Sequence, residues 1–263
     1  MREVTPGLGP ERILLYGAPK LGKTRLATAL PWGEPPWGDR ALYVAWDPNA
    51  DQLRSVMPED AAHLTVIQPR GERGKPWDPW LAASAIATKE WPDVSTIIWD
   101  TISQTAQDVL AFYASQLRFP NEATQIGIPG SKAHHVIPAR GDYRDVNTSV
   151  GHHLLNFLFE RPYNLIVVAH EEWDKPDDGN AEAFGGPVLA GKGSVRLLAG
   201  KFDSVIRIQS KRMGAKTEYV ARANSHGAWR CGVRSTVPLE DQTLSVRPTD
   251  FWRTYTAAVR RTA

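Results

Sequence analysis

Short hydrophobic runs recur along most of the chain, and several are closed by a glycine, a proline or an acidic residue. These runs predict buried strands at residues 12–16, 41–46, 64–67, 95–100 and 164–169. Helix-forming stretches separate or flank them, at residues 25–30, 80–90, 103–118 and 148–160. Because strands that alternate with helices form a mainly parallel sheet covered on both faces, the pattern predicts an α/β fold whose ligands bind at the carboxyl ends of the strands.

The C-terminal part of the chain follows a different pattern. Residues 202–208 and 218–222 predict two strands of a hairpin that turns near Met213 and Gly214. Two long segments, residues 119–146 and 171–193, are rich in glycine and polar residues and are expected to be irregular. Loops of that length in a compact domain are usually functional or disordered.

Length and composition limit the class of protein. With 263 residues, 42% of them hydrophobic, we expect a single domain over residues 1–263, with a core at about 11–210 and a basic hairpin and tail at about 202–263. No apolar run approaches the ~20 residues of a membrane span, and the N-terminus lacks a run of signal-peptide length. We therefore expect a cytoplasmic protein with no membrane partner. The single cysteine, Cys231, excludes an internal disulfide and a multi-cysteine zinc site.

Charge is unevenly distributed. The chain carries a net charge of +2, but residues 190–235 hold ten Lys or Arg against two acids. That segment therefore carries +8 and the rest of the chain −6. A basic segment on an otherwise acidic protein favours a polyanion partner, although solvated strand faces give similar counts.

The strongest motif follows the first predicted strand, where the pattern G-x-x-x-x-G-K-T occupies residues 17–24. Glycines at both ends allow the loop to curl so that its N–H groups point at phosphate oxygens. In this P-loop, Lys23 would reach the β and γ phosphates of ATP, and the Thr24 hydroxyl would bind Mg²⁺. The predicted nucleotide-binding residues are Gly17, Ala18, Pro19, Lys20, Leu21, Gly22, Lys23, Thr24 and Arg25.

A second acidic motif lies at the end of the strand at residues 95–100. Asp100 would hold the Mg²⁺ ion through its water shell, because a carboxylate beside the P-loop is what a P-loop enzyme needs there. Residue 101 is Thr rather than Glu, so a catalytic base must come from elsewhere.

Two further strand ends carry candidate catalytic groups. Asp47 could orient and deprotonate the water that attacks the γ-phosphate, but an Asp-Pro step also starts turns. His170 could sense the γ-phosphate, or it could be an ordinary residue at a strand end. The pairs His134-His135 and His152-His153 lack the spacing of a zinc site.

Taken in order, these motifs resemble the phage-type RecA-like ATPases, which include phage nucleotide-binding proteins and RecA-like single-strand annealing proteins. The likeness runs from about residue 12 to residue 234, through the P-loop, the strand ending in Asp100-Thr101, the strand ending in His170-Glu171, and a Gly-Lys-rich stretch before Phe202-Asp203. It implies a RecA-like P-loop NTPase core of the α/β class with a C-terminal β-hairpin extension.

The resemblance also implies partners and roles. The family pattern has an acid at the end of the second strand as catalytic base, which matches Asp47 although Glu is usual. The family binds ATP and single-stranded DNA, often as a homo-oligomer with nucleotide between subunits. The long loops, residues 119–146 and 171–193, would face DNA. Because single strands are held by cations that follow the phosphates, Lys192, Arg196 and Lys201 are candidate DNA contacts, although such cations also occur on ordinary wet surfaces. A late Trp-x-x-Lys-x-Arg pattern is approximated by residues 229–234, where the lysine is missing, so that Arg230 and Arg234 are candidate trans-acting cations.

Three functional classes follow. The favoured one is an ATP-binding, ATP-hydrolysing RecA-like protein that binds single-stranded DNA in phage recombination, annealing or replication, in the host cytoplasm if phage-encoded. An AAA+-type helicase loader or packaging motor is disfavoured because such proteins usually carry Asp-Glu at the second motif. A P-loop small-molecule kinase would use Arg140 and Arg144 as lid residues, and would leave the basic hairpin without a role.

Overall fold

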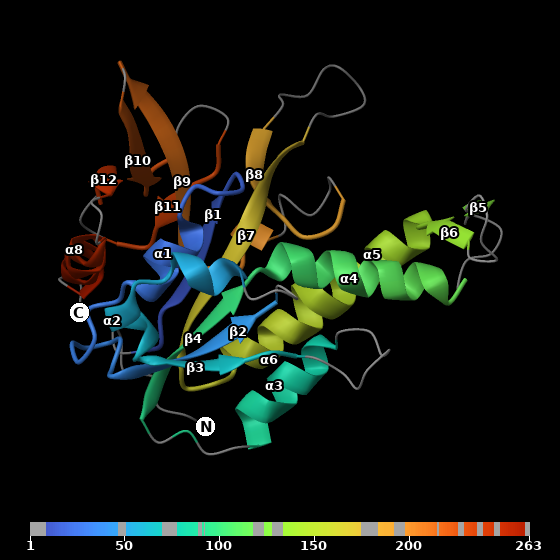
Figure 1. Cartoon of the computed structure of the whole chain (residues 1–263), viewed down its shortest axis with the longest axis horizontal. Coiled ribbons are helices and arrows are strands. Elements are labelled where there is room, and N and C mark those ends of the chain that lie inside the picture. Colours follow the sequence, from blue (N-terminus) through green and yellow to red (C-terminus); the bar gives the residue numbers. More distant parts are fainter. Residues whose placement is uncertain are drawn as a thin grey trace.

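A twisted sheet of mainly parallel strands forms the centre of the computed structural model (Figure 1). The structure describes residues 9–46, 51–69, 78–88, 91, 93–117, 124–127, 134–174, 184–191, 198–214, 216–225, 229–235, 239–244 and 248–260. The parallel strands are β1 (Arg12–Gly17), β2 (Arg40–Ala45), β3 (Leu64–Ile67), β4 (Val94–Asp100), β7 (Asn164–Asp174) and β9 (Ser204–Met213). They lie in the order β9-β1-β7-β4-β2-β3. Their carboxyl ends therefore meet at one edge of the sheet.

Antiparallel strands extend this sheet. On the β9 side, β10 (Lys216–Arg222) pairs with β9 and β12 (Gln242–Leu244) pairs with β10. The short strands β8 (Phe184–Val188) and β11 (Gly232–Val233) pair with β7 and β9. The prediction of an α/β core with a mainly parallel sheet and a C-terminal hairpin is confirmed, while the single-domain division remains a prediction.

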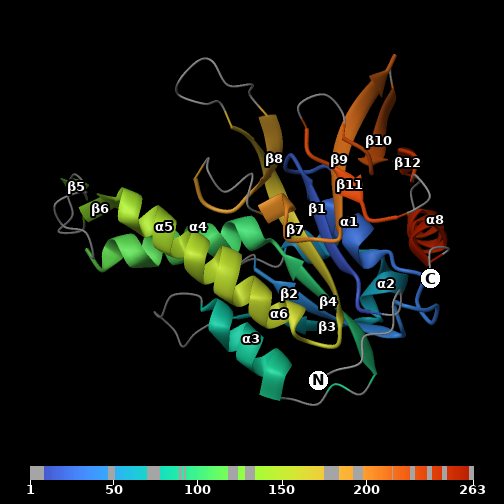
Figure 2. The same cartoon turned by 180° about the vertical axis from the view of Figure 1, so that it is seen from behind.

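Helices cover both faces of the sheet. One face carries α3 (Pro79–Thr88), α4 (Ile102–Ser115), α5 (Arg140–Thr148), the π-helix η2 (Ser149–Leu154) and α6 (Leu155–Phe159). Helices α3, α5 and α6 lie in front of the strands in Figure 2. The other face carries α1 (Lys23–Thr28) and α8 (Thr249–Arg260). The short helices η1 (Asp51–Ser55) and α2 (Pro58–Ala61) follow β2. No helix in the described part of the chain is long and apolar enough to cross a bilayer.

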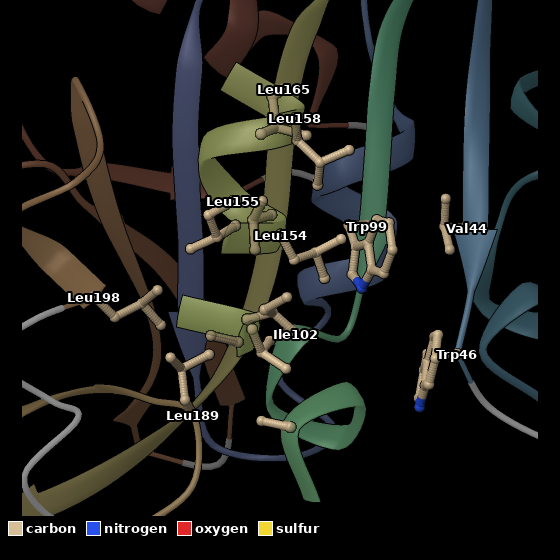
Figure 3. Packing of buried hydrophobic residues seen from close by; sticks show 14 of the residues in the cluster. Val44, Trp46, Trp99, Ile102, Leu154, Leu155, Leu158, Leu165, Leu189 and Leu198 are labelled. Carbon is tan, nitrogen blue, oxygen red and sulfur yellow. The ribbon is translucent and has the colours of Figure 1, made fainter. Parts of the chain in front are cut away.

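Strand alternation divides the core into two layers. In β1, Leu14 and Tyr16 point to the α4 side, whereas Ile13 and Leu15 point to the α1 side. Figure 3 shows the α4 side, where side chains of the η2–α6 segment pack against the strands. Because both faces of the central strands are buried, their sequences are nearly continuous hydrophobic runs, which is why they could be predicted.

The prediction that residues 119–146 are irregular was wrong in part. Helix α5 begins at Arg140 and continues through η2 and α6, so the helix predicted from residue 148 starts eight residues earlier. A small hairpin of β5 (Thr124–Gly127) and β6 (His134–Ile137) lies within the same segment. Helix α5 escaped prediction because it is strongly polar; its start is fixed by the Asp142 carboxylate, which accepts a hydrogen bond from the Ala139 N–H at 2.9 Å.

The segment 171–193 also contains regular structure. Strand β7 runs on to Asp174 and pairs with β8 across it, so His170 lies inside a strand rather than at its end. This part of β7 is polar because it projects beyond the covered sheet, and it lacks the hydrophobic pattern that marks a buried strand.

Candidate functional site

The P-loop joins β1 to α1 at the carboxyl edge of the sheet. Gly22 precedes the helix with φ 81°, a left-handed conformation that favours glycine. Lys23 is buried, and its Nζ donates hydrogen bonds to the carbonyl oxygens of Gly17 at 2.9 Å and Ala18 at 2.7 Å. Burial lowers the pKa of Lys23 to about 8, with the charges of Asp100 and Glu171 opposing that shift. The ammonium group is thus held inside the curve of the loop.

Gly17 is required for a steric reason. A Cβ atom at this position would lie 2.3 Å from the carbonyl oxygen of Ile208 in β9. The first glycine of the motif therefore allows the neighbouring strand to approach the start of the loop, whereas Gly22 is required for its backbone conformation.

Thr24 and Asp100 meet directly beside the loop. The Thr24 hydroxyl donates a hydrogen bond to Asp100 Oδ2 at 2.6 Å, and the Tyr43 hydroxyl donates to the same oxygen at 2.7 Å. Asp100 is 1% exposed. It lies on the α1 side of β4, because it is two residues after Ile98, which is buried in the core layer on that side. A hydroxyl and a carboxylate side by side are the hard oxygen ligands that Mg²⁺ prefers, so these residues fit the ion that a P-loop implies. The described residues contain no cluster of three His, Cys, Asp or Glu that could hold a metal without phosphate or water.

His170 lies on β7, between the P-loop strand and the strand of Asp100. Its backbone N–H donates to the Ser103 hydroxyl at 2.8 Å, and that hydroxyl donates to the Val188 carbonyl, so α4 joins β7 to β8 at this point. Burial, and after it the charge of Lys23, lowers the pKa of His170 below its ordinary value. This shift favours the neutral imidazole, which can donate one hydrogen bond and accept another.

A cleft of about 1170 Å³ opens over these groups. One wall is formed by residues 19–25 of the P-loop, together with Asp100, Thr101 and His170. A second is formed by residues 54–58, which follow β2. The C-terminal strands supply a third, through residues 217–219 of β10, residues 243–244 of β12, and Pro248.

A family profile described as an AAA domain matches residues 10–235, which is most of the chain and contains the P-loop, Asp100 and His170. The chain belongs to this AAA domain family. It is accordingly a P-loop NTPase, in agreement with the loop geometry.

Solved structures show weaker likeness to this AAA domain protein. A KaiC-like protein from the hyperthermophilic archaeon Pyrococcus horikoshii aligns with a TM-score of 0.47 and 11% identity, covering 90% of this chain and 86% of that chain. The flagellar accessory protein FlaH from Methanocaldococcus jannaschii aligns with a TM-score of 0.38 and 15% identity, covering 81% of this chain and 79% of that one. The search of curated proteins gave no match.

Several predicted residues of the AAA domain either lie outside the described part of the chain or lie away from the cleft. Asp47, Lys192 and Arg196 lie outside the described residues. The N–H of Asp203 donates to the carbonyl of Arg12, at the amino end of β1. Lys201 is two residues before Asp203, so Lys201 lies toward the edge of the sheet opposite the cleft. Arg234 is near the same edge and forms an ion pair with Asp203 at 2.9 Å. Arg230 is exposed, and its N–H binds the Gly185 carbonyl in β8.

Sequence reasoning missed a second cluster, on the α4 side of the same strands. Arg207 forms an ion pair with Glu171 at 3.0 Å, and its guanidinium carbon lies 3.4 Å from the centre of the Trp229 ring. The rings of Trp229 and Trp173 are 4.8 Å apart, and Trp173 is 44% exposed. The sequence carries one signal of this cluster: Glu171 and Trp173 are two and four residues after buried Ala169, so all three point to the same face of β7. Arg207 and Trp229 are distant in sequence, and no local pattern links them to this face.

Proposed function

We propose that this P-loop NTPase binds ATP with Mg²⁺, hydrolyses it, and binds single-stranded DNA in phage recombination, annealing or replication. The observation that carries the ATP part is the convergence of Lys23, Thr24 and Asp100 at one end of a cleft large enough for a nucleotide. Two motifs separated in sequence, the P-loop and the end of β4, meet at the point where the sheet topology predicts a ligand.

The roles follow from the contacts. A triphosphate would replace the carbonyl oxygens of Gly17 and Ala18 as the partner of the Lys23 ammonium, exchanging neutral acceptors for charged ones. Thr24 and Asp100 would hold Mg²⁺, which supplies charge neutralisation of the phosphates when bound. Neutral His170 would donate to or accept from the terminal phosphate or its attacking water. Asp47 remains our candidate for the base that orients this water.

The proposed assembly is a homo-oligomer with nucleotide between subunits. Arg230 is our preferred trans-acting cation, since it is exposed on the side of β8. Arg234 is the weaker candidate, because its N–H binds the Asp203 carbonyl near the amino end of β1, at the other edge of the sheet.

Two surface features support a single-stranded DNA partner. Trp173 presents an exposed ring beyond the carboxyl edge, backed by Trp229. The basic hairpin of β9 and β10 exposes Lys211, Arg212 and Lys216 around its turn. Single strands are held by cations that follow the phosphates and by flat rings that stack on bases, so both ingredients are present.

We expect single-stranded DNA to stimulate ATP turnover severalfold, and ATP to increase the particle size. The physical reason is that β7 carries both His170, in the cleft, and Trp173, on the proposed DNA surface. The test is an ATPase assay with and without an oligonucleotide, run beside light-scattering mass measurements with and without ATP. Turnover indifferent to DNA would remove this partner and leave a P-loop ATPase of another pathway, while absence of any ATP turnover would remove the hydrolysis.

The Trp173→Ala variant is expected to weaken binding of an oligo-dT strand by about fivefold or more, the cost of losing one stacked base. Fluorescence anisotropy measures this directly. Trp80→Ala is the matched control, because Trp80 is 41% exposed but lies on α3, away from the carboxyl edge of β7. Equal losses in the two variants would show that the effect is not local to this surface.

A further inference from the structure

The cleft extends well past the P-loop on the side of the C-terminal strands. Thr217, Glu218 and Tyr219 of β10 line this part, together with Thr243 and Leu244 of β12. None of these residues belongs to the phosphate-binding motif. They reach the cleft because β10 and β12 lie on the same sheet as β1, beyond β9.

Strand order gives the cleft a direction. Asp100 on β4 and His170 on β7 lie to one side of β1, while β9, β10 and β12 follow on the other side (Figure 1). Neighbouring strands lie about 4.8 Å apart, so β10 is about 10 Å from β1. A nucleoside triphosphate has its metal-binding phosphates at one end and its base at the other. With the phosphates held by Lys23 and Asp100, the part of the cleft beside β10 is available to the base.

Tyr219 is oriented toward this part of the cleft. Residues two apart in a strand point to the same face of the sheet, so Tyr219 shares a face with Ala221. Ala221 is buried in the same core layer as Leu26 of α1, which places Tyr219 on the P-loop side of the sheet. Leu244 is its direct cross-strand partner and belongs to the same layer. The Tyr219 side chain is 41% exposed, and among the described cleft residues it has the only six-membered aromatic ring.

The wall formed by residues 54–58 is less suited to a base. Val56 is buried, and the Met57 sulfur accepts a hydrogen bond from Arg25 Nη2 at 3.1 Å, so its most polarisable atom is held against α1. Tyr219 and Leu244 instead present a flat ring beside an aliphatic side chain, the kind of surface on which a heteroaromatic base stacks.

We infer that Tyr219 and Leu244 form the nucleobase-binding wall of the cleft, with Tyr219 stacking on the base. This inference rests on the proposed ATP-binding function and adds the residues that contact the part of the ligand remote from the P-loop. The wall recognises a base by its flat face, which every nucleobase has, so ATP and GTP bind with similar affinity.

The test is calorimetric binding of ATP, GTP and inorganic tripolyphosphate to the wild type and to ring-removing variants. Tyr219→Ala and Tyr219→Thr are expected to weaken ATP binding by about tenfold, while Tyr219→Phe stays within about twofold. Tripolyphosphate has no base, and its affinity is expected to be unchanged in all variants. The threonine variant keeps strand propensity if the alanine variant folds poorly. Phe112→Ala, which removes a 40% exposed ring from α4, is the control.

Each outcome has a distinct meaning. ATP affinity unchanged in both ring-removing variants overturns the wall, as does an equal loss of ATP and tripolyphosphate binding. If the wild type binds ATP more than tenfold more tightly than GTP, stacking on Tyr219 is not sufficient to explain base recognition, and that part of the inference is overturned. A wild type that binds no ATP overturns the proposed function itself, and the wall with it.

Discussion

The Lys23→Ala variant is expected to lose ATP turnover by a factor of about 100 or more, which is the usual cost of removing one preorganised charge from a transition state. Lys23 is buried between the P-loop carbonyls and is shielded from solvent, so bulk water cannot take over its role. ATP binding should weaken in parallel, because the β and γ phosphates lose their closest cation. Steady-state phosphate release and calorimetric ATP binding measure the two effects.

Arg40→Ala provides the control, since it removes an exposed positive charge from β2 at the opposite edge of the sheet. Thermal melting of both variants separates a lost contact from a lost fold. Normal ATP affinity in a folded Lys23→Ala protein would contradict the P-loop assignment, because no other residue at 17–24 offers a buried cation.

The central fold could be predicted because burial on both faces leaves a direct trace in sequence. The sequence shows hydrophobic runs in strands β1, β2, β4 and β7. Each run is followed closely by a glycine, a proline or a polar residue, which marks its end. The P-loop could be predicted for a different reason: the Gly22 conformation and the Gly17 approach to β9 both exclude a side chain, so glycines are required at fixed spacing.

The elements that escaped prediction are those whose stability comes from distant or polar contacts. Helix α5 is specified by a carboxylate cap rather than by an apolar stripe. The distal half of β7 is specified by pairing with β8. Local pattern has no access to the pairing of β7 with β8, because it joins residues that lie apart in the sequence. The cap of α5 joins residues only three apart, but a polar cap without an apolar stripe does not mark a helix.

The site divides in the same way. Thr24 and Asp100 could be assigned because each sits in a recognisable local motif. Tyr43 could not, although its hydroxyl reaches the same carboxylate, since a tyrosine in a buried strand has no signature of that role. The C-terminal wall was beyond reach for a further reason, which is that Tyr219 enters the cleft only through the order of β1, β9 and β10.

The Asp100→Asn variant is expected to lower ATP turnover by about 100-fold while keeping the fold and much of the ATP affinity. The amide oxygen can still accept the hydroxyls of Thr24 and Tyr43, so the buried contacts survive. The asparagine side chain has no negative charge, so the variant lacks the carboxylate that would hold Mg²⁺. The measurement is a magnesium titration of turnover, in which the variant should need more Mg²⁺ and reach a lower maximum.

The matched control is Asp108→Asn, because this carboxylate also accepts two partly buried hydrogen bonds, from Trp46 Nε1 at 2.7 Å and from Gln104 at 2.9 Å, but lies on α4 outside the cleft. Its turnover and magnesium dependence should match those of the wild type. If Asp100→Asn behaved in the same way, the contact between Thr24 and Asp100 would be a structural hydrogen bond only. Metal binding would then need another carboxylate, and Asp47, which follows β2 in the sequence, would be the first to examine.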